Sequence, residues 1–311
     1  MAHGKIAVIG GANMDIGGLV SDKLRMHDSN IGTVRLSPGG VGRNIAENAA
    51  RLGLHTEFVG AIGGDANGEM LLTDCREKSI GTTHCLLAKE DRTSVYLFID
   101  DERGDMCVAV NDMAIQSKLT PAFFEGKVSW LNTLDAVIVD ANLPTESLAY
   151  LAQNVRVPLI ADAVSTAKAA RLIPALPGLF AIKPNRYEAE ALTGIVVTNT
   201  QTALDAANAL LDRGVHRVYL TMGPQGALCA ERGRAYLVPT MARELVNATG
   251  AGDAFIAAVV WAQVRQFSPE DCARAGVAAA SVTTEAMESV SPRMSAELVL
   301  KCMAGTQPRK L

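Results

Sequence analysis

The stretch Ile6-Ala7-Val8-Ile9-Gly10-Gly11-Ala12-Asn13-Met14-Asp15 gives the first indication of the fold, because an unbroken apolar run leads into a glycine pair and then into polar residues. A strand that is apolar at every position is buried on both faces, as in a parallel sheet covered by helices. Similar runs follow at 136–139, 158–161, 179–182 and 218–221. Helical patterns separate them, at about 42–53, 66–79, 145–153, 186–193, 201–213, 251–266, 270–287 and 295–303. The sequence therefore predicts an α/β fold with a doubly wound, mainly parallel sheet.

Two segments, 14–37 and 93–113, do not fit a strand-helix-strand unit. The second contains an alternating stretch at 93–99, a polar turn around Gly104 and another apolar stretch at 106–110, which is typical of a β-hairpin. We expect both segments to form a small sheet that stands off the core as a lid or a dimerisation surface. No linker or repeat indicates a second domain, so residues 1–311 are predicted to form one domain with this lid.

The composition narrows the class of protein. Of the 311 residues 49% are hydrophobic, and no apolar run reaches the length of about 18 residues that a membrane helix needs. Lys and Arg total 29 against 33 Asp and Glu, a net charge of −4 that gives no general attraction to nucleic acid. The six cysteines are scattered, without a Cys-x-x-Cys pair, as expected of reduced thiols. We expect a soluble cytoplasmic protein without a nucleic-acid or membrane partner.

The segment Asn247-Ala248-Thr249-Gly250-Ala251-Gly252-Asp253 opens a long apolar helix. Glycines before a helix N-terminus let several backbone N–H groups converge, and the helix dipole favours an anion such as phosphate there. Asp253 is then placed to accept a proton from a hydroxyl group while the amides stabilise a transferring phosphoryl group. The alternative is an ordinary helix cap, since Asp is common at that position and the Walker-A pattern is absent.

A second glycine-rich turn, Pro38-Gly39-Gly40-Val41-Gly42-Arg43-Asn44, also runs into a helix. Glycines allow a ligand to approach the backbone, and Asn44 can donate and accept hydrogen bonds, which suits the vicinal hydroxyls of a sugar. The alternative is the phosphate turn of a dinucleotide site, but the spacing is not Gly-x-Gly-x-x-Gly and Pro38 interrupts the preceding strand. Asn13 and Asp15 could bind neighbouring hydroxyls in the same way, or simply stabilise a polar turn.

Together these segments resemble the ribokinase-like sugar kinases, also called the phosphofructokinase-B family. Two further motifs follow in family order, at 183–190 and in Thr221-Met222-Gly223-Pro224-Gln225-Gly226, so the resemblance covers essentially the whole chain. It implies a Rossmann-like core with a β-lid, and ATP as phosphoryl donor. The implied catalytic residues are Asp253 as base with the amides of Gly250, Ala251 and Gly252 as anion hole. The implied sugar contacts are Asn13, Asp15, Gly39, Gly40 and Asn44, and the implied nucleotide site comprises Lys183, Asn185, Thr221, Gly223, Gly226 and Thr249.

The resemblance also bears on metal ions. Asn185 and Glu188 match the family's Asn-x-x-Glu motif, which helps to organise Mg²⁺ and its waters, although the same pair could be a helix cap with its carboxylate. Many members of the family have Asp at the first position of the segment that corresponds to residues 247–253, where it helps to hold a monovalent cation. This chain has the neutral Asn247, so a K⁺ requirement is in doubt.

Within the family, the segments around Asn44, Asn111, Asn142 and Asn247 most resemble the members that act on the nucleoside pseudouridine. A nucleoside base needs polar partners beyond those for ribose, and lid residues lie over the part of the substrate remote from the 5′-hydroxyl. The candidates for this role are Thr93, Ser94, Asn111 and Asp112, with turn chemistry as the alternative, and Asn142 is expected near the sugar.

Three other functions are alternatives to this one. The nearest is a family kinase for another substrate, such as ribose, inosine, guanosine or 2-keto-3-deoxygluconate. A non-catalytic sugar sensor is opposed by the intact Asp253 loop and by the lack of a DNA-binding extension. A dehydrogenase is opposed by the missing glycine fingerprint after the first strand. The lid also makes a homodimer the favoured assembly.

Overall fold

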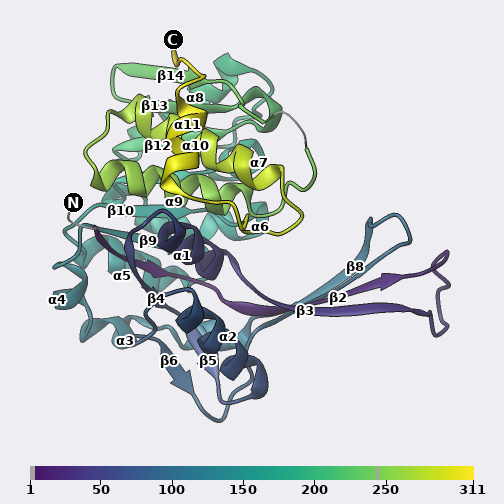
Figure 1. The fold of residues 1–311 in the computed structure, drawn as a ribbon. Helices are drawn as coiled ribbons and strands as arrows, with labels where there is room; N and C mark the ends of the chain where they lie inside the picture. The colour runs from purple at the N-terminus through teal and green to yellow at the C-terminus, as the bar shows by residue number, and fades with distance from the viewer. Residues whose placement is uncertain (1–3, 243–244) are drawn as a thin grey trace.

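A computed structural model describes residues 4–242 and 245–311 (Figure 1). The main sheet of the described residues is built from β1 (Lys5–Ile9), β4 (His55–Val59), β9 (Ala136–Asp140), β10 (Leu159–Asp162), β11 (Ala181–Lys183), β12 (Arg217–Thr221), β13 (Ala227–Glu231), β14 (Arg234–Val238) and β15 (Arg309–Lys310). Its strand order is β15-β14-β13-β12-β11-β10-β9-β1-β4. The strands from β12 to β4 run parallel, and β13 to β15 form an antiparallel edge. The predicted doubly wound, mainly parallel α/β fold is confirmed.

Helices cover both faces of this sheet because its central strands are apolar on both sides. Ile6 and Val8 of β1 pack into one core, and Ala7 and Ile9 into the other. The first core lies under α1 (Val41–Arg51), α2 (Ala66–Glu77), α9 (Ala251–Val264), α10 (Pro269–Thr284) and α11 (Ala296–Met303). The second lies under η1 (Ala114–Lys118), α3 (Pro121–Glu125), α4 (Val128–Leu131), α5 (Thr145–Asn154), α6 (Thr166–Ala169), η2 (Ala170–Gly178), α7 (Arg186–Thr193) and α8 (Thr200–Asp212).

The eight helices predicted from periodicity are all present, with ends within three residues of the prediction. The short elements α3, α4 and α6 were not predicted, because four or five residues do not complete a recognisable helical repeat. No helix in the described ranges combines the length and the apolarity that crossing a bilayer requires.

A separate four-stranded sheet extends from the core as an arm (Figure 1). It is built from β2 (Asn13–Val20), β3 (Gly32–Gly39), β7 (Val95–Asp100) and β8 (Met106–Asp112), in the order β3-β2-β7-β8. The segments for which the sequence predicted a lid supply these strands, and β7 and β8 pair as an antiparallel hairpin. A small parallel pair, β5 (Ala61–Gly63) with β6 (Leu86–Ala88), lies beside α2. That the whole chain is one domain and that the arm acts as a lid stay predictions.

Candidate active site

Neighbouring strands of the main sheet end in polar residues along one edge. Gly10 follows β1, Asp140 ends β9, Asp162 ends β10, Lys183 ends β11 and Thr221 ends β12. In open α/β sheets ligands bind at the carboxyl ends of the strands. Of the predicted substrate contacts, Asn13 and Asn142 follow β1 and β9, and of the predicted nucleotide contacts, Lys183, Asn185 and Thr221 lie at the ends of β11 and β12.

The two glycine-rich turns of the substrate side pack against each other. Gly40 has φ +97°, and a Cβ atom there would lie only 2.6 Å from the Cα of Ala12. A Cβ on Gly42 would lie 2.9 Å from the Cα of Gly10. Glycine is therefore required at both positions for this close approach.

Asn13 and Asp15 lie beside the second turn. Asn13 pairs with Gly39 across β2 and β3, and its Nδ2 donates to Asp15 Oδ1 at 2.6 Å. Burial raises the pKa of Asp15, although Asn13 and the Arg43 charge oppose the shift. The predicted sugar contacts Asn13, Asp15, Gly39 and Gly40 are thus brought together.

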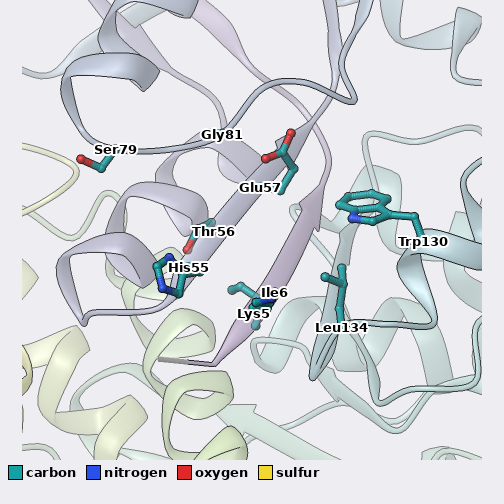
Figure 2. A pocket seen from close by; sticks show the side chains of 9 residues that line it. All are labelled: Lys5, Ile6, His55, Thr56, Glu57, Ser79, Gly81, Trp130 and Leu134. Atoms are coloured by element: carbon teal, nitrogen blue, oxygen red, sulfur yellow. The ribbon is translucent and has the colours of Figure 1, made fainter. Parts of the chain in front are cut away.

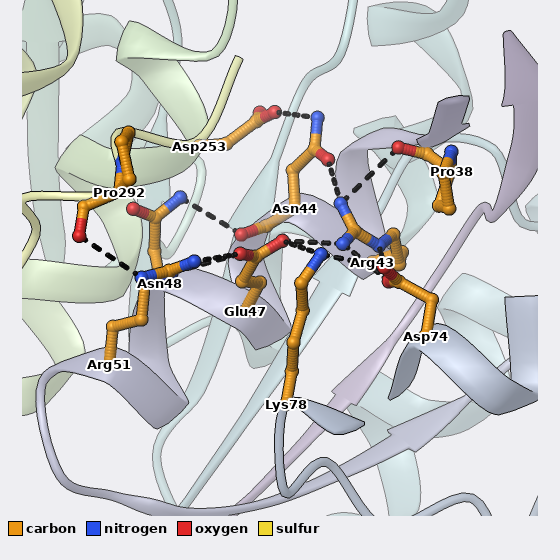
Figure 3. A network of polar contacts seen from close by, with 10 residues as sticks. All are labelled: Pro38, Arg43, Asn44, Glu47, Asn48, Arg51, Asp74, Lys78, Asp253 and Pro292. Carbon is orange, nitrogen blue, oxygen red and sulfur yellow. Dashed lines mark hydrogen bonds and ion pairs between the residues drawn. The ribbon is translucent and has the colours of Figure 1, made fainter. Parts of the chain in front are cut away.

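Asp253 lies in the first turn of α9, three residues after Gly250, which has φ +79° at the N-cap. The carboxylate is 8% exposed, and its Oδ2 accepts a hydrogen bond from Asn44 Nδ2 at 3.0 Å (Figure 3). Burial, together with the negative charge of Asp162, raises the pKa of Asp253 to about 8, against the opposing effects of Lys183 and Asn44. The two signature turns, 209 residues apart in sequence, therefore meet at this carboxylate.

Lys183 lies directly under the glycine loop. Its Nζ forms an ion pair of 2.8 Å with Asp162 Oδ2, and a Cβ on Gly252 would lie 2.6 Å from that nitrogen. Burial acts to lower the pKa of Lys183, but the charges of Asp162 and Glu188 outweigh it and raise that pKa. The sequence placed Lys183 among the nucleotide contacts, and that role stays a prediction. In the structure the buried ammonium has Asp162 as its ion-pair partner and lies against the loop residue Gly252.

The remaining nucleotide candidates cluster at β12 and at the start of α9. Thr221 forms a bridge with Asn185, and its backbone N–H donates to the carbonyl of Pro184 at 2.9 Å. Gly223 and Gly226 have φ values of +59° and +89° in the turn that follows, around η3 (Gly223–Gln225). Thr249 is exposed immediately before Gly250.

Asn185 and Glu188 form the helix cap that was the alternative to their magnesium role. Asn185 Oδ1 accepts from the N–H of Glu188 at 3.0 Å, and Glu188 Oε2 accepts from the N–H of Asn185 at 2.7 Å. In the parts of the chain that the structure describes, no three His, Cys, Asp or Glu side chains group as a metal cage. Mg²⁺ keeps several of its waters, so one buried carboxylate and one amide fit an ion held through water.

Asn247 makes two local hydrogen bonds. Its Oδ1 accepts from the N–H of Thr249 at 2.9 Å, and its Nδ2 donates to the carbonyl of Met287 at 2.8 Å. The side chain is therefore neutral and engaged in local hydrogen bonds.

Asn142 is buried beside the first glycine turn. Its Oδ1 accepts from Lys168 Nζ at 2.6 Å, and its Nδ2 would lie 2.7 Å from a Cβ on Gly11. Burial lowers the pKa of Lys168, although the Asp140 charge opposes the shift. Asn142 and Lys168 thus form one polar group at the substrate side of the sheet edge.

The four predicted base contacts divide into two pairs. Thr93 is buried, and its hydroxyl donates to Asp65 Oδ1 at 2.6 Å and accepts from the N–H of Gly63 at 3.0 Å. Ser94 is also buried, with its Oγ 3.4 Å from Gln116 Nε2. The Thr93 hydroxyl thus bonds to Asp65, the N-cap residue of α2, and a contact between Thr93 and the substrate stays a prediction.

The other pair, Asn111 and Asp112, lies exposed at the end of β8. Asp112 Oδ1 accepts from the N–H of Ala114 at 3.2 Å, which is the turn chemistry named as the alternative. Asn111 pairs with Tyr96 across the lid hairpin. Neither side chain is buried by the protein, and their contact with a substrate stays a prediction.

Asp140 was not among the predicted site residues. It is fully buried and accepts from the N–H of Gly11 at 2.8 Å and from the N–H of Asn142 at 2.8 Å. Burial raises its pKa to about 6. The signal that could have found it is a single carboxylate at the end of the apolar run Ala136-Val137-Ile138-Val139.

A hollow of about 310 Å³ lies away from this edge (Figure 2). It is lined by the beginnings of β1 and β4, including Lys5 and His55, and by Trp130. Because these are the amino ends of the strands, the hollow lies opposite the edge that carries Asp253, and it is not part of the site.

The fold and the site define a phosphotransferase of the doubly wound α/β class, in which a glycine loop and a carboxylate occupy one helix N-terminus. The model of the pfkB family of carbohydrate kinases matches residues 3–296, and the chain belongs to this family. It is therefore an ATP-dependent kinase that acts on a hydroxyl group of a sugar or nucleoside. The family membership expected from the motifs is confirmed.

The similarity extends over most of the chain. Pseudouridine kinase of Escherichia coli strain K12 is 34% identical over 254 residues, which cover 81% of each chain. Guanosine-inosine kinase of Exiguobacterium acetylicum is 28% identical, over 93% of this chain and 98% of its own length. The solved structure of a carbohydrate kinase from Agrobacterium tumefaciens superposes with a TM-score of 0.89 at 29% identity, covering 99% of this chain and all of its own.

Proposed function

We propose that the protein phosphorylates the 5′-hydroxyl of pseudouridine with ATP, giving pseudouridine 5′-phosphate and ADP. The observation that carries the proposal is the bond from Asn44 to Asp253, because it joins the sugar turn to the carboxylate beside the glycine loop. The choice of pseudouridine rests on the 34% identity to the kinase named for that nucleoside.

In this proposal Asp253 accepts the proton of the 5′-hydroxyl as its oxygen attacks the γ-phosphorus of ATP. Asn44 holds the carboxylate in place, and the backbone N–H groups of Gly250, Ala251 and Gly252 stabilise the charge that spreads over the phosphoryl oxygens. Since the pKa of Asp253 in the free protein is about 8, the carboxyl group must lose its own proton before it can serve as base. Asn185 and Glu188 would hold Mg²⁺ through water, and the ion would neutralise phosphate charge.

The ribose is proposed to lie between Asp15, Asn44 and the Gly39–Gly40 turn, with Asn142 nearby. Asn111 is the lid residue that we propose for the base, because it is exposed at the end of β8. Closure of the lid would exclude water that could otherwise hydrolyse ATP.

We also propose that the protein is a homodimer joined through the lid, and that it acts in the cytoplasm. The lid exposes apolar side chains on two strands, among them Val34 at 68%, Val108 at 55% and Val110 at 60%. A second lid would cover such a surface. The buried cysteines Cys75 and Cys229 have raised thiol pKa values because of burial, which suits unreactive thiols in a reducing compartment.

The test is ADP release with Mg²⁺ and ATP over a panel of acceptors: pseudouridine, uridine, guanosine, inosine, ribose and 2-keto-3-deoxygluconate. Uridine is the matched control, because the isomers share the ribose but pseudouridine presents one more ring N–H. A site that binds that N–H should prefer pseudouridine by at least about 100-fold in kcat/KM. Preference for another acceptor contradicts the substrate, and binding of a sugar without turnover of any acceptor would instead indicate a sensor.

A further inference from the structure

A buried arginine, Arg43, lies between the lid and the residues that hold Asp253 (Figure 3). Its side chain is only 3% exposed. Its Nε and Nη2 donate to Asp74 Oδ2 at 3.1 Å and 2.6 Å, and Nη2 also donates to Glu47. Its Nη1 donates to Asn44 Oδ1 at 3.0 Å and lies 3.4 Å from the carbonyl oxygen of Pro38 in β3.

The Asn44 amide is held between two groups of opposite hydrogen-bonding character. A guanidinium group can only donate hydrogen bonds, and an ionised carboxylate can only accept them. Arg43 therefore requires the amide oxygen of Asn44 on its side, and this leaves the Asn44 NH₂ group facing Asp253 Oδ2 at 3.0 Å. If the amide were flipped, two donors would face each other at Arg43 and two acceptors at Asp253.

We infer that Arg43 is a positioning residue for phosphoryl transfer, which fixes the amide of Asn44 so that its NH₂ group holds the ionised Asp253. This inference rests on the proposed role of Asp253 as base. It assigns to Arg43 a part in the reaction although the side chain does not touch the reacting atoms.

The neighbouring ion pairs show that the contact with Asn44, rather than the contacts with Glu47 and Asp74, is what depends on Arg43. Glu47 has other cationic partners, Arg51 at 2.8 Å and Lys78 at 3.0 Å. Lys78 also pairs with Asp74 at 2.7 Å. Both acids thus keep a counter-charge if Arg43 is removed, and a buried ionic network is in any case weak evidence for stability. Only Asn44 and Pro38 would lose their arginine contact without replacement by these cations.

The charged groups that face Asp253 are Asp162, Lys183 and Asp140. They lie at the ends of β10, β11 and β9, whereas the ionic partners of Arg43 lie on α1 and α2. The bond from Asn44 to Asp253 links the two groups of charges. Replacement of Arg43 therefore acts on Asp253 through the Asn44 amide as well as through loss of its own positive charge, and Arg43→Lys, which keeps the charge, separates the two effects.

The test compares Arg43→Met with Arg51→Met, a matched loss of an arginine from the same network that leaves Asn44 untouched. The readout is the pH profile of kcat/KM. For Arg43→Met we expect the acidic limb to move up by about one pH unit, and kcat/KM at pH 7 to fall by about 10-fold or more, with KM for ATP unchanged. Arg51→Met should leave the limb in place. Equal profiles for the two variants would overturn the inference.

A second measurement needs no substrate and so separates this inference from the proposed function. The pH dependence of Tm is compared for wild type, Arg43→Met, Asp253→Asn and the double variant. Loss of Arg43 also acts on Glu47 and Asp15, whose pKa values its charge acts to lower against the effect of burial, so the quantity that reports on Asp253 is the difference between the two backgrounds. Loss of Arg43 should change the pH dependence more when Asp253 is present than in the Asp253→Asn background. The same change in both backgrounds would overturn the inference, whereas an additional effect in the Asp253 background would support it even if no acceptor were phosphorylated. If Arg43→Met does not fold, Arg43→Lys is used. We then expect a smaller shift of the acidic limb in the same direction, because the lysine ammonium cannot reproduce the planar set of N–H donors of the guanidinium group.

Discussion

Replacement of Asp253 by asparagine should abolish most of the activity and at the same time stabilise the fold. The carboxylate is buried at the start of α9 near the negatively charged Asp162, and these surroundings raise its pKa from 3.8 to about 8. Asparagine has nearly the same shape and can still accept the hydrogen bond from Asn44 through its amide oxygen. It carries no charge and cannot act as a base, so kcat should fall by at least about 100-fold.

The direction of the stability effect follows from the two pKa values. Between pH 3.8 and about 8 the folded protein keeps the proton on Asp253, whereas the unfolded chain releases it. The unfolding free energy that this group contributes therefore falls as the pH rises through that window. At about 1.4 kcal/mol per pH unit, the upper limit at pH 7 is about 4 kcal/mol. We expect about half of that, near 2 kcal/mol, because the new amide N–H groups also need partners in the buried site.

The assay is thermal unfolding of wild type and Asp253→Asn between pH 5 and pH 8.5. For a chain of this size the variant should melt about 4 °C higher at pH 7, and its advantage should grow with pH. Asp205→Asn, an exposed position on α8, is the matched control and should give no such trend. A Tm difference that stays constant or shrinks as the pH rises would refute the assignment of a raised pKa to Asp253.

Four further predictions test the surroundings of the site. Gly250→Ala should destabilise the protein by about 3 kcal/mol or more in denaturant unfolding, since a Cβ at φ +79° would overlap a neighbouring backbone carbonyl; an unchanged midpoint would contradict the loop geometry. Lys183→Met leaves Asp162 buried without its ion-pair partner and should lower the unfolding free energy by about 3–5 kcal/mol, whereas a loss of ATP affinity without loss of stability would show that Lys183 acts on the nucleotide instead. Exchange of K⁺ for Na⁺ should leave kcat unchanged, because Asn247 is neutral and locally bonded, and strict K⁺ activation would show otherwise. Val108→Asp on the exposed lid should turn a dimer into a monomer in sedimentation experiments, and an unchanged assembly would exclude this face.

The fold could be predicted from sequence because its physical signals are local. Buried parallel strands such as 136–139 are apolar at every position, and long helices such as α9 show clear boundaries in glycine and polar residues. The two-residue strand β15 and the short helices α3, α4 and α6 have too few residues to produce a pattern of their own.

The site was predictable where a motif places a residue on a turn, and less so where tertiary contacts decide its role. Asp253 and Asn44 lie in recognisable glycine turns, but their mutual bond spans 209 residues and no local pattern reveals it. Thr93 is a candidate substrate contact because its hydroxyl is polar and close to the lid strand β7 in sequence. Only the folded chain shows that the same hydroxyl bonds to Asp65.

Asp140 and Lys183 illustrate the same limit. Each ends a buried strand. The ion-pair partner of Lys183 is Asp162 at the end of the neighbouring strand, and Asp140 accepts from Gly11 in the turn after β1 in addition to nearby Asn142. The charge of a buried residue is thus visible in the sequence, whereas its partner from another strand or turn is not.

The most direct test of the central claim is kcat/KM for pseudouridine and for uridine, measured by ADP release for wild type and for Asp253→Asn under the same conditions. The account predicts rapid release with pseudouridine, a preference of at least about 100-fold over uridine, and loss of nearly all turnover in the variant. Ordinary turnover by Asp253→Asn, or equal rates for the two isomers, would contradict it.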